Sequence, residues 1–107
     1  MAQRGMNQEM MKQIQALQGK IARAQQALEE TKIEASSGGG AVSVVMTAQP
    51  RLESIAIQAD VVDASDVEML QDLIMAAMNE ALEQARASQM QQLAGVAGGL
   101  NIPGLTT

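Results

Sequence analysis

The side chains best suited to bind a phosphate-bearing ligand lie near the start of the chain. Residues 1–28 contain a single acid, Glu9, and four basic residues: Arg4, Lys12, Lys20 and Arg23. On a helical wheel, Lys12 and Arg23 lie close to opposite an apolar seam, and Lys20 lies on its flank. Lysine and arginine bind phosphate through charge-assisted hydrogen bonds, which favours a polyanion on this face. A helix whose lysines are merely solvated has the same pattern, so both interpretations stay open.

A cluster of acids within residues 60–72 is the second chemically suggestive feature. Carboxylate oxygens are the ligands that calcium and magnesium prefer, so a hard-cation site is one interpretation. The cluster lacks the alternation and the glycine of a calcium loop, and acids in the first turn of a helix cap free N–H groups. We therefore expect capping and solubility, without a metal, from Asp60, Asp63, Asp66, Glu68 and Asp72.

The residue types most used in catalysis are missing. The chain has no histidine and no cysteine, which removes the usual general base and the cysteine nucleophile and leaves any serine without a histidine partner. Gly38-Gly39-Gly40 precedes a predicted strand, without the Lys-Ser/Thr and helix of a phosphate-binding loop, so it is typical of a turn. We expect a protein that is not an enzyme and needs no cofactor.

Composition indicates a small domain that gains buried area by self-association. The 107 residues include nine methionines but no Phe, Tyr or Trp, and methionine packs adaptably but specifies a core poorly. With no disulfide either, oligomerisation is the expected source of extra buried surface. No segment approaches the roughly 20 apolar residues of a membrane span, and the N-terminus is too polar for a secretory signal. We expect a soluble, cytoplasmic protein with no membrane partner.

Charge is distributed unevenly along the chain. The net charge of −5 argues against strong nucleic-acid binding. Residues 52–107 hold eight acids against Arg86 alone, whereas residues 1–28 are basic. A polyanion is therefore expected to approach the first predicted helix rather than the last.

An apolar seam in the first segment predicts a helix, from about residue 7 to about residue 31, that needs a partner. Apolar residues recur there at alternating spacings of four and three, which is the a/d pattern of a coiled coil. The seam consists of Met10, Ile14, Leu17, Ile21, Ala24 and Leu28. Because a stripe this narrow is not buried by its own helix, we expect it to be an association face.

The middle of the chain predicts a small antiparallel sheet. Residues 33–36, 41–47 and 52–57 predict two or three strands of a meander with one face covered. A second helix should follow, with Asp63 as its N-cap or with a competing capping box of Ser65 and Glu68.

This second helix is predicted to continue to about Gln92. Over residues 67–78 it is apolar on more than one face, which exceeds what covering a sheet requires and predicts a subunit interface. We expect one domain over residues 1–94 and a flexible, glycine-rich tail over residues 95–107. The expected core and dimer residues are Ile14, Leu17, Ile21, Leu28, Leu70, Leu73, Ile74 and Ala77.

Six stretches of the chain match, in order, those of a known family. They are MMKQ at 10–13, GGGAVSV at 38–44, DVVD at 60–63, DVEMLQDLI at 66–74, AAMNEA at 76–81 and GGLNIPG at 98–104. In these stretches the chain resembles the YbaB/EbfC family of bacterial nucleoid-associated proteins. The resemblance implies an α+β subunit of order α-β-β-β-α, in a homodimer whose long helices project like tweezers.

The resemblance also implies binding of double-stranded DNA with little sequence specificity, and a place on the nucleoid. Gene neighbours in the family suggest replication or recombination proteins as further partners. The family's basic positions on the projecting helices match Lys12, Lys20, Arg23 and Arg86. Gln15 and Gln26 add side-chain amides that can donate hydrogen bonds to phosphate oxygens.

The chain departs from the more basic family members, which carry extra Lys and Arg on the third strand and late in the second helix. Here Arg51 and Arg86 are surrounded by acids, which lowers the expected DNA affinity and leaves the expected fold unchanged. An alternative function is a protein-interaction or adaptor module. It would dock replication, repair or targeting partners through the acidic second helix and the apolar residues of the tail.

Overall fold

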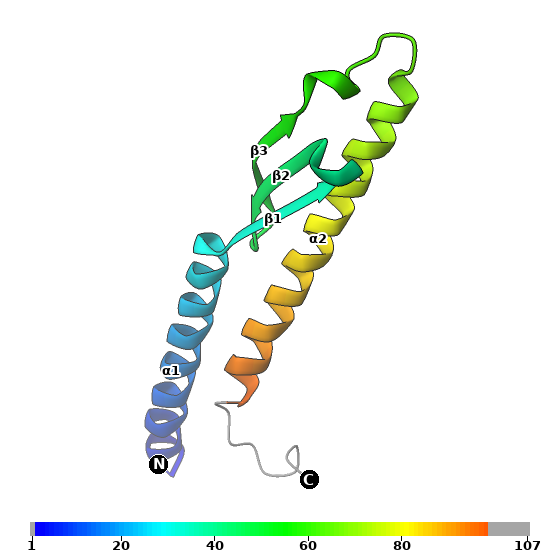
Figure 1. Cartoon of the computed structure of the whole chain (residues 1–107). Coiled ribbons are helices and arrows are strands. Elements are labelled where there is room, and N and C mark those ends of the chain that lie inside the picture. Colours follow the sequence, from blue (N-terminus) through cyan, green and yellow to red (C-terminus); the bar gives the residue numbers. More distant parts are fainter. Residues whose placement is uncertain (1, 99–107) are drawn as a thin grey trace.

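The protein is an elongated α+β subunit, described by a computed structural model over residues 2–98, with side chains from residue 8 (Figure 1). Its extents are 76 × 28 × 16 Å and its radius of gyration is 21.2 Å, against about 13 Å for a compact chain of 100 residues. The elements follow the predicted order α-β-β-β-α. Two long helices extend from a small sheet, and this accounts for the length.

Helix α1 spans Ala2–Glu30 and begins five residues earlier than predicted. Gly5 is the single poor helix former in the added residues, which is too weak a signal to stop a helix. At the other end, the Thr31 hydroxyl and its backbone N–H both donate to the carbonyl of Ala27, at 2.6 and 3.0 Å. These bonds close the last turn and direct the chain into the sheet.

The sheet is the predicted antiparallel meander, in the order β1-β2-β3. Strands β1 (Lys32–Ser37) and β2 (Val42–Thr47) are joined by a short 3-10 turn, η1, at Gly38–Gly40. Strand β3 (Arg51–Ile57) follows a tight turn. All three glycines of η1 have positive φ, a conformation that other residues rarely adopt, so the turn interpretation is confirmed.

The core lies between one face of the sheet and helix α2, which spans Val67–Gly98. Alternate residues of β2 on this face are at most 1% exposed: Val42, Val44 and Met46. On α2, Ala77, Ala81 and Ala85 are equally buried at successive turns, and their small side chains let the helix lie close to β1 and β2 (Figure 1). No residue of β3 is buried.

The start of α2 differs from the prediction. Asp66 is the N-cap, because its carboxylate accepts a hydrogen bond from the Met69 N–H at 3.2 Å. Asp63 instead accepts bonds from the hydroxyl and the N–H of Ser65, at 2.7 and 2.9 Å. Asp63 as N-cap and the Ser65–Glu68 capping box were therefore both wrong. The Asp63 carboxylate and the Ser65 hydroxyl bond to each other in a local turn, so neither is available to cap the helix. This turn ends before the helix begins at Val67.

The end of α2 also lies later than predicted, at Gly98 rather than near Gln92. Residues 91–94 are mostly good helix formers, and Gln92 among them lines a cleft with α1, so the thinning apolar pattern does not end the helix. The predicted tail over residues 95–107 thus begins inside α2. Its remainder, residues 99–107, lies outside the described residues.

Candidate nucleic-acid interface

Helices α1 and α2 leave the sheet side by side and run in opposite directions (Figure 1). Side chains 8–16 of α1 are all exposed, so this half of the helix projects from the body of the chain. Half-buried positions recur later in α1, where α2 lies alongside. The projecting part of α1 and the last turns of α2 therefore form one arm of the subunit.

A cleft of about 320 Å³ lies between the two helices of this arm. Lys20, Arg23 and Ala24 line it from α1, and Gln92, Gly95 and Val96 line it from α2. The lysine is half-buried and the arginine is exposed. The cleft is therefore lined by two cations and a neutral amide, and no acid lines it.

Lys12 extends this basic surface toward the end of the arm. It is exposed and, at 1.5 Å per residue, lies about 16 Å along the helix axis from Arg23. The separation of 11 residues is close to three helical turns, so both side chains leave α1 on nearly the same side. Lys12, Lys20 and Arg23 form what we call the basic face of α1.

The other predicted polar contacts are more scattered. Gln15 is exposed on α1. Gln26 is also exposed, and its amide donates to the Glu30 carboxylate at 3.3 Å. Arg86 lies in a separate hollow of α2, lined by Glu80 and Glu83 among others. The structure therefore does not bring Arg86 together with the basic face of α1.

The predicted apolar residues divide into three groups. Leu28 and Ala77 are buried, whereas Leu17, Leu70, Leu73 and Ile74 are half-buried. Ile14 and Ile21 remain 48% and 41% exposed. The seam of α1 is thus buried at Leu28, next to the sheet, and only partly covered further along the arm.

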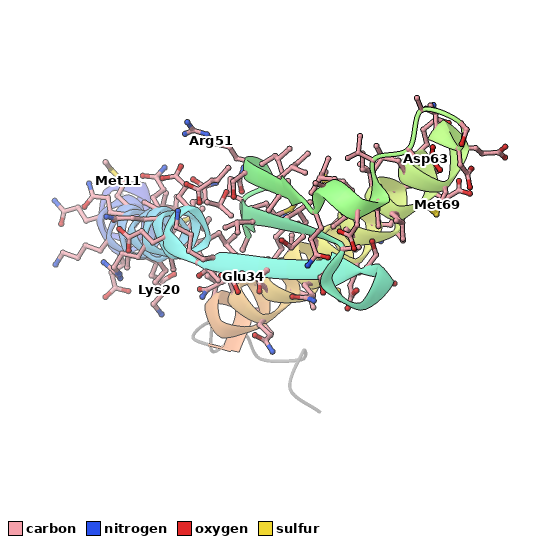
Figure 2. The ribbon with its side chains drawn as sticks, turned by 45° about the horizontal axis from the view of Figure 1, so that its top comes forward. Met11, Lys20, Glu34, Arg51, Asp63 and Met69 are labelled. Atoms are coloured by element: carbon pink, nitrogen blue, oxygen red, sulfur yellow. The ribbon has the colours of Figure 1, made fainter. Side chains whose placement is uncertain are left out.

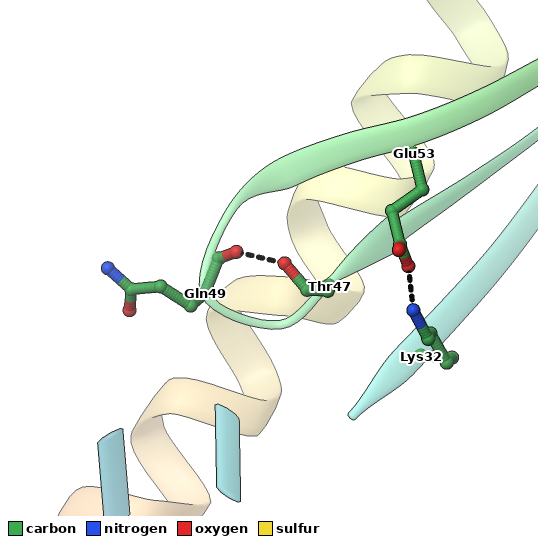
Figure 3. Close-up of polar contacts among 4 residues, drawn as sticks. All are labelled: Lys32, Thr47, Gln49 and Glu53. Carbon is green, nitrogen blue, oxygen red and sulfur yellow. Dashed lines mark hydrogen bonds and ion pairs between the residues drawn. The ribbon is translucent and has the colours of Figure 1, made fainter. Parts of the chain in front are cut away.

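The remaining cations of the sheet end lie away from the basic face. Lys32 forms an ion pair with Glu53 across the sheet, beside a hydrogen bond from the Thr47 hydroxyl to the Gln49 carbonyl (Figure 3). Arg51 and Lys20 lie on opposite sides of the molecule (Figure 2). Arg51 is therefore a suitable control position for tests of the basic face.

Residues 2–98 offer neither a metal site nor a membrane span. No group of acidic side chains among them is arranged to hold a metal ion, and neither helix is both long and apolar enough to cross a membrane. Two acids before α2, Asp63 and Asp66, have local roles. The two bonds from Ser65 hold the pKa of Asp63 below its usual range, and Asp66 caps the helix.

Sequence reasoning missed Gln92 as part of the cleft. Its position follows only from the antiparallel alignment of α1 and α2, which no local pattern reports. The run Gln91-Gln92 near the end of α2 is the one sequence signal that pointed to a polar surface there.

Comparison with known proteins decides the family. The sequence profile of the YbaB/EbfC DNA-binding family matches residues 3–100. The chain belongs to this family. The resemblance seen in the six short stretches is therefore confirmed over nearly the whole chain.

Two YbaB/EbfC relatives illustrate the similarity. A nucleoid-associated protein of Alkaliphilus metalliredigens is 51% identical over 96 residues, covering 90% of this chain and 84% of the relative. A nucleoid-associated protein of Syntrophobacter fumaroxidans is 47% identical over 95 residues, covering 89% and 86%.

A solved structure supports the fold independently. The crystal structure of an uncharacterized protein from Helicobacter pylori superposes with a TM-score of 0.76, covering 83% of this chain and 94% of that one. The sequence identity is 19%, so this likeness concerns the fold alone. The YbaB/EbfC chain described here therefore has a fold that also exists in a distant sequence.

Proposed function

We propose that this protein is a non-enzymatic, nucleoid-associated protein that binds duplex DNA as a homodimer, with low sequence specificity. The observation that carries the proposal is the basic face of α1, on a projecting arm of an otherwise acidic chain. Lys20 and Arg23 line the cleft between α1 and α2, and Lys12 continues their surface. The family and its nucleoid-associated relatives support DNA as the ligand.

Low specificity follows from the kind of side chains available. The basic face offers cations and amides, which contact phosphate oxygens and carry no direct sequence information. The chain has no aromatic residue that would stack on an exposed base, which favours duplex over single-stranded DNA. Non-specific binding of this type has a Kd of about 10⁻⁴ to 10⁻⁶ M at physiological salt and weakens as salt rises.

The homodimer is supported by an apolar surface that the single chain leaves uncovered. On β3, Ile55 and Ile57 pair in register with Val44 and Val42, and so lie on the core face of the sheet. Because α2 covers β1 and β2 only, these isoleucines are 42% and 40% exposed. A second copy of the chain offers the same apolar surface, as a two-fold interface requires.

The same proposal covers the protein's localisation in the cell and its protein partners. A DNA-binding protein of this family is expected in the cytoplasm on the nucleoid, beside replication or recombination proteins. The adaptor alternative predicts that such partners bind without DNA. Capture of a partner from lysate that persists after nuclease digestion would favour the adaptor; loss of the partner on digestion would favour the DNA-binding protein.

Fluorescence anisotropy of labelled duplex DNA, titrated with the full-length protein at several salt concentrations, tests the proposal. We expect micromolar binding that weakens with salt. The variant with Lys12→Glu, Lys20→Glu and Arg23→Glu should lose binding, whereas Arg51→Glu, a reversal on the other side of the molecule, should bind nearly as the parent does. Absence of binding by the parent at low salt would refute the proposal.

A further inference from the structure

The turn between β2 and β3 holds the end of α1 in place. The last carbonyls of a helix have no partner within the helix and need one from elsewhere. Here the Gln49 N–H donates to the Leu28 carbonyl at 3.1 Å, and the Ala48 N–H donates to the Thr31 carbonyl at 2.9 Å. Ala48 is fully buried, so the point at which α1 leaves the sheet is fixed to this turn.

Helix α2 is fixed to the same turn by one side chain. The Gln89 amide nitrogen donates to the Ala48 carbonyl at 2.9 Å, across 41 residues of sequence, at a half-buried position. Ala48 therefore joins Thr31, the residue after α1, through its N–H and α2 through its carbonyl. Gln89 completes a direct hydrogen-bonded path between the two helices of the arm.

The arm beyond this point is held by partly buried side chains. Among the side chains that the structure describes, none before Leu28 in α1 and none after Ala85 in α2 is buried. Gln89 lies one turn beyond Ala85, and the cleft residue Gln92 lies within the following turn. The Gln89 bond thus holds α2 to the buried Ala48 one turn before the cleft.

We infer that Gln89 is a positioning residue for DNA binding: its bond to Ala48 sets the spacing of α1 and α2, and so the width of the cleft lined by Lys20, Arg23 and Gln92. The inference rests on the proposed function in that DNA is taken as the ligand of the cleft. Gln89 acts through the helices and touches the turn, not the DNA. A freely varying spacing would hold Gln92 of α2 at many distances from Lys20 and Arg23 of α1, and would reduce their joint contact with the phosphates.

The test compares Gln89→Glu with Gln91→Glu, which places the same charge two residues away on an exposed part of α2. A carboxylate does not donate to the Ala48 carbonyl, so only the first variant loses the bond. Gln89→Met removes the donor without adding charge and serves as a second variant. Circular dichroism and the oligomeric state establish that each variant is folded before it is compared.

The spacing is measured directly with spin labels. Because the chain has no cysteine, Ala22→Cys on α1 and Ala94→Cys on α2 give one label pair per chain, and dilution with unlabelled protein removes distances between chains. Pulsed electron paramagnetic resonance should show a broader distance distribution for Gln89→Glu and Gln89→Met than for Gln91→Glu. DNA affinity should fall about fivefold below that of the matched control, the factor that corresponds to the net contribution of one hydrogen bond.

The two measurements separate this inference from the proposed function. Unchanged distances in both Gln89 variants would overturn the positioning role. Broader distances with DNA affinity equal to that of the control would overturn its link to binding. If the parent protein binds no duplex DNA, the proposed function fails, and the distance distribution alone still decides whether Gln89 sets the spacing of the helices.

Discussion

Val44 and Ile55 lie directly opposite each other on β2 and β3, on the same face of the sheet, yet Val44 is 1% exposed and Ile55 is 42% exposed. Helix α2 packs over Val44 on β2 but does not extend sideways over Ile55 on β3. A bulge between Val45 and Met46 returns Leu52 to this face, opposite Met46, and Leu52 is also 42% exposed. Strand β3 thus presents a continuous apolar edge beside α2, where a second subunit is expected.

Replacing Ile55 by glutamate should therefore dissociate the dimer. Burying an isoleucine contributes about 1.5–3 kcal/mol, and a two-fold interface contains the residue twice, so the dissociation constant should rise about 100-fold or more. Sedimentation velocity over a concentration series measures this. Ser54→Glu is the control, because Ser54 pairs with Val45 on the other face of the sheet. Equal dissociation by both variants would argue against this face as the interface.

Gly38 should tolerate alanine poorly, for two separate reasons. Its φ is +60°, and an added Cβ would come within 2.9 Å of the Leu73 Cδ2 on α2. Gly39 has a similar φ of +66° but no atom within 4 Å of an added Cβ. Left-handed strain costs about 1–2 kcal/mol in either case, and only Gly38→Ala adds the collision. Urea unfolding should show a larger loss of stability for Gly38→Ala, and equal losses would mean that the Leu73 side chain shifts without cost.

The N-cap of α2 provides a test of the corrected helix start. Asp66→Ala removes the acceptor for the Met69 N–H and should lower the free energy of unfolding by about 1 kcal/mol. Asp66→Asn keeps an oxygen acceptor and should retain most of the stability. Thermal or urea unfolding measures both. A smaller effect for Asp66→Ala than for Asp66→Asn would contradict the assignment.

Much of the fold was predictable because its signals are local. Alternation of apolar residues identified β2, and the glycines of η1 require the turn that is found. The N-cap was mistaken because Asp63 and Asp66 are equally good caps by sequence, and a hydrogen bond from Ser65 decides between them. The cleft was not predictable as a unit. Gln92 and Arg23 line the same cleft only because α1 and α2 pack antiparallel, and the two residues are far apart in the sequence.

Asp63 should titrate at a lower pH than an ordinary aspartate. The hydroxyl and the N–H of Ser65 both stabilise its carboxylate, which lowers the pKa in the folded chain. Any resulting stabilisation is complete above the unfolded pKa of about 3.9 and is lost as pH falls through the lowered folded value. An NMR titration should give a low pKa in the parent and a higher one in Ser65→Ala. No difference between the two would mean that the Ser65 hydroxyl does not bind the carboxylate in solution.

Arg23 of α1 and Arg86 of α2 provide the sharpest test of which surface meets DNA. Arg23 lines the cleft with Lys20, whereas Arg86 lies in a hollow with Glu80 and Glu83, where the two acids repel phosphate. Arg23→Ala and Arg86→Ala remove the same charge, so an effect of net charge alone would be equal for both. Each phosphate contact that is lost lowers the slope of log K against log salt by about 1.

We therefore expect Arg23→Ala to weaken duplex binding across sequences and to reduce that slope, while Arg86→Ala leaves both nearly unchanged. Anisotropy titrations at four or more salt concentrations measure affinity and slope together. Sedimentation velocity of both variants checks that they have the same oligomeric state before their DNA affinities are compared. If Arg86→Ala reduces the slope as much as Arg23→Ala does, DNA contacts the outer side of α2 as well, and the basic face of α1 is only part of the interface.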